Sequence, residues 1–245
     1  MSSEAVNEGF LLSNFVPQLP PSVFMSAVAW SVVAALSIAV ALKPKLVPSR
    51  LQIVMEGLLG YVCGLADEIV GPKAPRYYPL FIGLFFFILV SNIMGLIPVL
   101  KSPTSDPALT FGLAVMVFLY FNAVGIKEQG WGYFKQFAGP KMPLGLLPVK
   151  LLIVFVEIVS LFLRPFSLGL RLYCNIFSKE LFLAILTVLI YQFFVMEHSP
   201  LGVVPLVLRL FIPFLGLIVA FIQALVFMIL TMTYIAGAVQ TQEHH

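Results

Sequence analysis

Charged residues are scarce in this 245-residue chain, because Asp, Glu, Lys and Arg together make up only 10% of it. Soluble globular domains carry about 25% charged residues, so this composition excludes an ordinary soluble fold. Apolar residues make up 60% of the chain, and the mean hydropathy is +1.04. The shortage of charge and the excess of apolar residues predict a polytopic membrane protein.

Cysteine and histidine are rare as well. Cys63 and Cys174 lie in apolar surroundings, so we interpret them as small buried side chains rather than as a disulfide framework. The three histidines lie outside the apolar segments and form no HExxH motif, so we expect neither a metal nor another cofactor. No GxxxxGK[ST] loop is present, so the chain has no nucleotide site of that kind. We expect no nucleic-acid partner.

The order of the apolar segments predicts an all-α fold with one membrane domain over residues 1–245. Residues 1–22 form a polar, Pro-rich lead-in outside the membrane. Val23–Leu42 is an N-terminal span, since about 20 apolar residues cross the hydrocarbon core. Leu51–Val70 has apolar residues at helical spacing, which favours an amphipathic surface helix over a poor span. Its run is interrupted by Gln52, Glu56, Asp67 and Glu68.

Residues 78–126 are predicted to form a two-helix hairpin. Its spans are 78–100 and 109–126, and the turn between them is rich in Pro, Ser and Asp. Asn92 lies inside the first span, where a helix–helix hydrogen bond is a better explanation than an ion ligand.

Basic residues fall mainly in the loops after residues 42, 70 and 126, whereas Lys101 alone falls in an opposite loop. By the positive-inside rule, this asymmetry places the N-terminus outside and the C-terminus in the cytoplasm.

A stripe of charge runs through the next apolar segment. Glu157, Arg164 and Arg171 are spaced seven residues apart, so they share one face of a helix. A charge buried in a bilayer costs from about 3 to over 10 kcal/mol, which indicates a functional reason. On this helix Glu157 is about 21 Å from Arg171, and Glu180 is about 14 Å away on the opposite face. The counter-ion of Arg171 is therefore expected on another chain.

Residues 144–196 run for 53 residues without an adequate break. Two spans would fit this length, but the charge stripe favours one long tilted helix. Residues 201–239 return as a second long helix after a turn near residue 198. In the resulting hairpin, residues 144–239, Glu180 is predicted to meet Gly216. Gln223 is predicted to lie level with Tyr173, within reach of Arg171.

The residues around Arg171 resemble a known motif. Ser167-Leu-Gly-Leu-Arg171-Leu-Tyr-Cys-Asn175, with Glu180 nine residues after the arginine, resembles the core of subunit a of bacterial F-type ATP synthases. Tyr173 and Cys174 depart from the Phe-Gly that is common in this family. Lys179 replaces a residue that is often small, and well-known members carry an ionisable residue where this chain has Gly216.

The resemblance implies a non-catalytic ion-channel subunit in the bacterial inner membrane. An outer half-channel would deliver H⁺ or Na⁺ to a carboxylate on each c-subunit, and a cytoplasmic half-channel would release it. Arg171 would separate the two half-channels and stabilise the ionised rotor carboxylate. The other implied site residues are Asn175, Glu180 and Gln223 in the outer path, Glu157 and Ser167 in the cytoplasmic path, and Arg164 and Gly216 in support.

The implied partners are the c-subunit ring, which the long tilted hairpin would face, the b-subunit peripheral stalk, the rest of the F-type ATP synthase and membrane lipid. A self-contained secondary transporter is the alternative, but it should show repeated halves with paired broken helices, and the sequence has no such repeat. A membrane scaffold without ion movement does not explain the stripe of charge.

Overall fold

The computed structural model describes residues 21–41, 50–97, 102–130, 132 and 147–240. No strand occurs among these residues, so the all-α prediction is confirmed. Most of the predicted lead-in, residues 1–20, lies outside the described residues, as does most of the basic loop after residue 129. The helices are α1 (Pro21–Ala41), α2 (Arg50–Val70), α3 (Tyr78–Met94), α4 (Pro107–Gln129), α6 (Leu147–Tyr191) and α7 (Val203–Gln240).

Three described helical stretches are long and apolar enough to cross a membrane: Pro107–Gln129, Val149–Phe194 and Pro200–Val239. Ser22–Ile38 and Tyr78–Met94 are also apolar but shorter. These helices agree with the polytopic membrane protein that the composition predicts.

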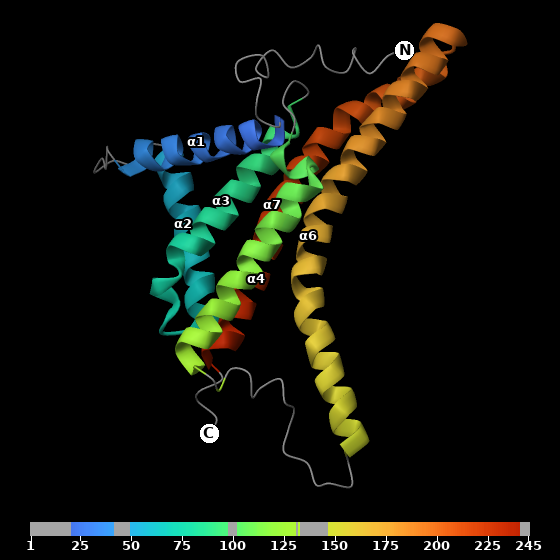
Figure 1. Cartoon of the computed structure of the whole chain (residues 1–245). Coiled ribbons are helices and arrows are strands. Elements are labelled where there is room, and N and C mark those ends of the chain that lie inside the picture. The colour runs from blue at the N-terminus through green and yellow to red at the C-terminus, as the bar shows by residue number, and fades with distance from the viewer. Residues whose placement is uncertain (1–20, 42–49, 98–101, 131, 133–146, 241–245) are drawn as a thin grey trace.

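Helix α3 is the centre of the packed bundle, and α1, α2 and α7 all contact it (Figure 1). Its aromatic run is almost fully enclosed, with Phe81 and Phe85 at 0% exposure. Phe87 stacks on Trp30 of α1 at 4.8 Å between ring centroids, and Phe85 meets Phe221 of α7 edge-on at 5.9 Å. A helix that is apolar on every side is stable only when it is buried in this way.

The turn between α3 and α4 is closed by buried hydroxyl groups. Ser102 donates to the Ser91 carbonyl at 2.9 Å, and Thr104 donates to the Asn92 side-chain oxygen at 3.0 Å. Asp106 then caps α4 by accepting from the Ala108 amide at 2.9 Å. Asn92 makes a structural hydrogen bond, as predicted, but its partner lies in the turn after α3 rather than on a second long helix.

The first two helices lie in different directions relative to α3. In Figure 1, α1 lies across the ends of α2 and α3, whereas α2 runs beside α3. Helix α2 buries Val62, Ala66 and Val70, which are four residues apart and therefore share one face. That face packs against α3 and α7, and the opposite face is exposed, as an amphipathic helix requires. How α1 and α2 lie relative to the membrane stays a prediction.

The long segment is one helix, not two spans. Helix α6 continues for 45 residues through Pro165, which corresponds to about 68 Å at 1.5 Å per residue. This length is about twice the hydrocarbon thickness of a bilayer. The prediction of one long helix is confirmed, because α6 has no break between its two ends. The chain turns at Glu197–Pro200, where His198 has a positive φ of 49°, and returns as the 38-residue α7.

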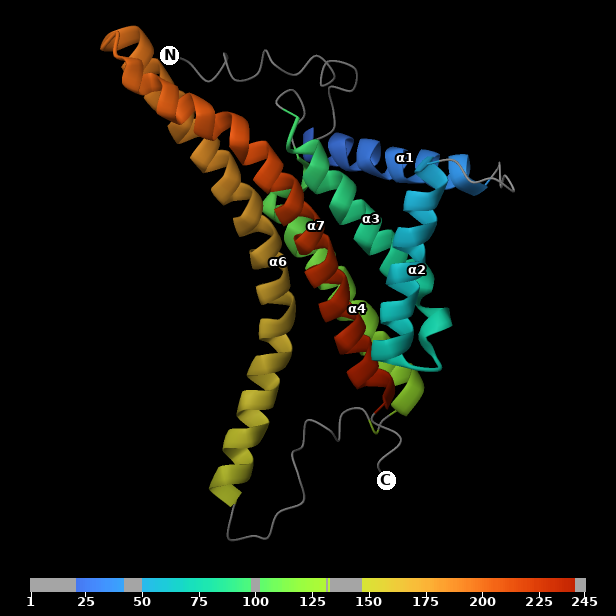
Figure 2. The same cartoon turned by 180° about the vertical axis from the view of Figure 1, so that it is seen from behind.

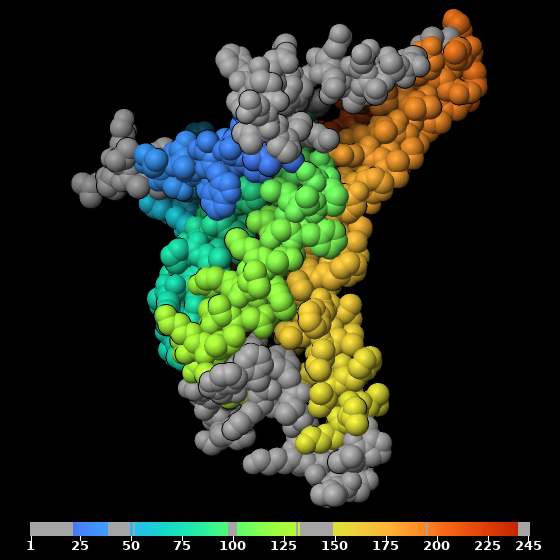
Figure 3. Space-filling view, viewed as in Figure 1, coloured from blue at the N-terminus to red at the C-terminus, as the bar shows by residue number. Residues whose placement is uncertain are grey.

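The two halves of α6 have different surroundings. Beyond Ser167 the helix buries Leu168, Leu172, Ile176 and Leu186, whereas no side chain from Val149 to Ser167 is fully buried. Figures 1 and 2 show this first half curving away from the bundle, and Figure 3 shows it as a separate column beside α4. Most exposed side chains of this first half are apolar. A surface of this kind needs lipid or another protein to cover it.

The backbone of α6 approaches α4 closely at Gly169, after Phe162 and Phe166 have met Phe118 and Phe111 of α4. A Cβ atom at this position would lie 2.9 Å from Phe111 Cδ1 and 3.3 Å from the Ala114 Cβ. Small residues at a helix crossing allow two membrane helices to approach closely. Gly169 therefore positions the part of α6 that carries Arg171.

We expect Gly169→Leu to force α6 away from α4 and to destabilise the protein by about 1–3 kcal/mol, as overpacking does. Gly112→Leu is the matched control, because a Cβ atom at Gly112 of α4 meets no atom within 4 Å. Thermal unfolding midpoints in detergent measure the effect. Equal midpoints for the two variants would contradict the predicted crowding at Gly169.

Candidate functional site

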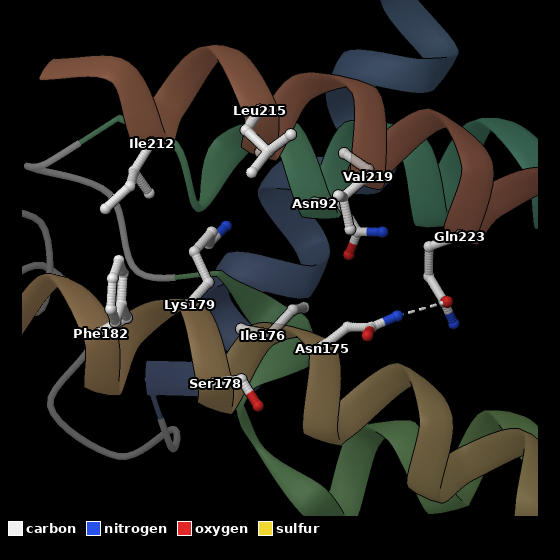
Figure 4. A pocket seen from close by; sticks show the side chains of 12 residues that line it. Asn92, Asn175, Ile176, Ser178, Lys179, Phe182, Ile212, Leu215, Val219 and Gln223 are labelled. Carbon is white, nitrogen blue, oxygen red and sulfur yellow. Dashed lines mark hydrogen bonds between the residues drawn. The ribbon is translucent and has the colours of Figure 1, made fainter. Parts of the chain in front are cut away.

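A cavity of about 370 Å³ lies between α6 and α7 and reaches α3 (Figure 4). Most of its wall is apolar, but amide, hydroxyl and amine groups face it from three helices. Its lining residues are Asn92 of α3, then Asn175, Ile176, Ser178, Lys179 and Phe182 of α6, and Ile212, Leu215, Gly216, Val219, Ala220 and Gln223 of α7.

A short hydrogen bond joins the two helices at one end of the cavity. The Asn175 side-chain amide donates to the Gln223 side-chain oxygen at 2.6 Å, and Gln223 is only 5% exposed. Nearer the turn, Arg209 donates to the Thr187 hydroxyl at 2.8 Å. Both pairs agree, within about half a helical turn, with a hairpin that folds at residue 198. The sequence predicted Gln223 at the level of Tyr173, and the structure places it against Asn175, two residues further along α6.

The residue that faces Gly216 is Lys179, not Glu180. A Cβ atom at Gly216 would lie 3.5 Å from Lys179 Cδ and 2.6 Å from Leu96 Cδ2. Glu180 is exposed and does not line the cavity. The predicted register was almost right, but one residue turns a side chain by about 100° around a helix, so the neighbouring residue enters the cavity. The predicted contact between Glu180 and Gly216 is thus corrected.

Lys179 is the one ionisable residue among the cavity's described lining residues. Its side chain extends from α6 into the space between the helices (Figure 4), and its Nζ would lie 3.4 Å from a Cβ atom at Gly95. Neither a hydrogen bond nor an ion pair holds this amine within the described part of the chain. The sequence shows that Lys179 stands where the family often has a small residue. Which space its side chain enters depends on the position of α7, which the sequence does not give.

Arg171 lies one turn of α6 from Asn175 and is exposed. Arg164, one stripe position earlier, sits over the ring of Tyr234 in α7, with its Cζ 5.5 Å from the ring centroid. Arg171 is also within electrostatic range of the Tyr234 hydroxyl. No carboxylate of the described residues pairs with either arginine. The ion pairs found among these residues join Glu128 to Lys73 and Arg76.

The other predicted residues lie apart from the cavity. Glu157 is half-buried and Ser167 is exposed, both on the half of α6 that leaves the bundle. Gln223 bonds to Asn175, and no bond from it to Arg171 is found among the described residues. Lys179 and Asn92 are cavity residues to which the sequence analysis gave no part in the ion path.

This arrangement can hold water inside a region of apolar helices. At about 30 Å³ per molecule, the cavity has room for on the order of ten waters, and three amide side chains and one amine can hydrogen-bond to them. At one end it stops within one turn of an exposed guanidinium, which keeps its charge at any ordinary pH. Such a site can hold hydrogen-bonded water that ends near a fixed positive charge.

A family model and several curated relatives point to the same family. The model of the family described as "ATP synthase A chain" matches residues 23–236. The chain is 36% identical to ATP synthase subunit a of Sulfurihydrogenibium sp. (strain YO3AOP1) over 222 residues, which cover 91% of this chain and 98% of the relative. Identity is 41% to ATP synthase subunit a 2 of Syntrophotalea carbinolica (80% and 75% covered) and 36% to ATP synthase subunit a of Aquifex aeolicus (82% and 89% covered).

The placement of Lys179 opposite Gly216 can be tested by crosslinking. In a background without Cys63 and Cys174, we expect a cysteine pair at positions 179 and 216 to react efficiently with a short bifunctional reagent. A pair at positions 180 and 216 should react several-fold less, because position 180 points about 100° away. Crosslinked product is measured by peptide mass analysis. Preferential reaction of position 180 would restore the register predicted from the sequence.

Proposed function

Because this chain belongs to the ATP synthase subunit a family, we propose that it passes H⁺ or Na⁺ to and from the rotating c-ring of an F-type ATP synthase. It would act as the stator half of the ion path, and the nucleotide chemistry would belong to other subunits. The proposal depends mainly on one observation, an exposed arginine on a membrane helix without a carboxylate partner in the described part of its own chain.

Arg171 supports this proposal through its charge. A guanidinium does not lose its proton at any ordinary pH, and leaving it unpaired in an apolar region is costly. A carboxylate on each passing c-subunit would supply the missing counter-charge and would be held in its ionised form by the arginine. The same positive charge repels a cation that moves directly between the two half-channels. Ion flow is then obliged to turn the rotor.

The cavity between α6 and α7 is our candidate for the inner end of the outer half-channel. It opens between two helices that could cross a membrane, and its polar wall includes Asn175, Gln223 and Lys179. Glu180 is the adjacent carboxylate, on the exposed side of α6. An ion that follows this path would reach the level of Arg171 after passing the Asn175–Gln223 pair.

The cytoplasmic half-channel is proposed along the first half of α6. Glu157 lies on the same stripe as Arg171, and Ser167 is one turn before it. This part of α6 has no fully buried side chain, so water and a neighbouring subunit can both reach it. Separate approaches on the two sides of Arg171 are what a rotary ion path needs.

The partners follow from the same surfaces. The exposed apolar faces of α6 and α7 would be covered by the c-ring and by lipid, and the b-subunit peripheral stalk would hold the subunit against rotation. We propose a multi-pass subunit of the bacterial inner membrane with its N-terminus outside and its C-terminus in the cytoplasm, as the basic loops indicate.

Replacing Arg171 should uncouple the enzyme. Arg171→Ala removes the charge, so we expect ATP synthesis to fall by about 100-fold or more, comparable to the loss of a central electrostatic group, and the membrane to leak ions. Arg171→Lys should also fail, because an ammonium is more strongly hydrated and lacks the planar donor fork. Vesicles containing the whole synthase measure both effects with an ion-sensitive dye.

Arg209→Ala is the matched control, since Arg209 is an exposed arginine of α7 that bonds to Thr187, away from the cavity. We expect this variant to stay coupled. Wild-type ATP synthesis by Arg171→Ala would mean that the arginine is only structural, and the proposal would fail.

Glu180→Gln tests the carboxylate beside the cavity. The amide keeps a hydrogen-bonding group but cannot bind or release a proton, so ATP-driven pumping should slow by about tenfold or more while assembly is preserved. Glu197→Gln in the hairpin turn is the control. Pumping by the Glu180 variant at the wild-type rate across about pH 6 to 9 would rule out a relay role for this residue.

A further inference from the structure

A second cavity, of about 200 Å³, lies at the opposite end of the bundle from the hairpin turn, where α3 begins and α4 ends. Hydrogen-bond donors from both helix ends face it. The lining residues are Arg76, Tyr77, Tyr120, Ala123, Val124, Lys127 and Glu128. None of them belongs to the ion path proposed above.

Positive charge exceeds negative charge around this cavity. Glu128 accepts from Lys73 Nζ at 2.7 Å and from Arg76 Nη1 at 3.2 Å, so one carboxylate is shared by two cations. Lys127 adds a third cation to the lining. Arg76 and Lys73 remain 55% and 47% exposed at their side chains, so both can bind another anion. The cluster has three cations to one carboxylate and therefore favours an anionic ligand.

Tyr77 is the second and independent sign of a ligand. It is 2% exposed, yet it lines the cavity, and its hydroxyl has no hydrogen-bond partner among the described residues. The hydroxyl oxygen itself is not fully enclosed, so it can donate a hydrogen bond to a ligand in the cavity. Burial, with a smaller contribution from Glu128, raises the pKa of Tyr77 above its usual value, so the group stays a neutral donor. A bound oxyanion would satisfy it.

The surroundings indicate where such an anion would come from. Helix α4 is apolar enough to cross a membrane, and the cavity lies at its last turns. Beside Tyr120 the same helix exposes a strip of large apolar side chains, Val115, Met116, Leu119 and Ile126. A ligand with a phosphate and hydrocarbon chains would occupy both features, whereas a free anion would use only the cavity.

We propose that this cavity binds the phosphodiester of an anionic membrane phospholipid, held by Arg76, Lys127 and the Tyr77 hydroxyl, with its acyl chains along α4. Basic pockets at the ends of membrane helices bind anionic headgroups in this way. The site is separate from ion translocation, so it can exist whether or not the proposed function is right. It would anchor the α3–α4 hairpin at the level of the headgroups.

Binding can be measured by native mass spectrometry of the purified full chain in detergent. Dioleoyl phosphatidylglycerol is the probe, and dioleoyl phosphatidylcholine has the same chains with a zwitterionic headgroup. The site variants are Tyr77→Phe, Lys127→Gln and the double change. All of them keep Lys73, Arg76 and Glu128, so the ion pairs that join the helix ends are preserved. The control is Tyr61→Phe with Lys150→Gln, the same chemical changes outside the cavity.

We expect the unaltered chain to bind phosphatidylglycerol at least about tenfold more tightly than phosphatidylcholine, a difference of about 1.4 kcal/mol. Each single site variant should lose most of this preference, the double variant should lose it entirely, and the control should keep it. Equal affinity for the two lipids would overturn the proposal, as would an unchanged preference in the double variant. Displacement of the lipid by millimolar inorganic phosphate would overturn it too, because the site would then take a free anion.

Discussion

A guanidinium keeps its charge even where the surroundings are apolar, and the arrangement of α6 and α7 around Arg171 depends on this constraint. Arg171 lies on a 45-residue helix whose other exposed residues are mostly apolar, and no carboxylate of the described chain reaches it. The hairpin meets this constraint by leaving the residue on an open surface, one turn from a cavity that is lined in part by amide side chains. A rotor carboxylate can then complete the ion pair, which makes the missing partner a requirement of the proposed function.

The uneven packing of α6 follows from the same requirement. Its second half is fastened to α4 through Gly169 and to α7 through the Asn175–Gln223 bond, which positions Arg171 between them. Its first half has no fully buried side chain from Val149 to Ser167 and stands away from the bundle (Figure 2). A firmly packed half next to an uncovered apolar half is compatible with the moving partner surface that we propose.

Among the described residues, charged side chains are paired at the helix ends and unpaired inside the long hairpin. At the helix ends, Glu128 is held by Lys73 and Arg76, and exposed ion pairs of this kind contribute modestly to stability. Inside the long hairpin, Lys179 and Arg171 have no ion-pair partner among the described residues. Pairing at the helix ends joins elements of the fold, whereas the unpaired interior charges remain available for the contacts that the proposed function needs.

The sequence by itself determined the all-α class, the turn near His198 and the family, because these depend on composition, on helical spacing and on one local motif. It favoured one long helix over two spans, and the continuous α6 decided between them. The sequence also placed Gln223 level with Tyr173, two residues from its actual partner Asn175, since a hairpin needs only its turn to set an approximate register. Only the tertiary structure decided that Lys179, rather than Glu180, enters the cavity. A one-residue step turns a side chain by about 100°, which is finer than any register inferred from a turn. The ion pairs of Glu128 could not be predicted for a related reason, because their partners lie more than fifty residues apart and meet only when α3 and α4 pack.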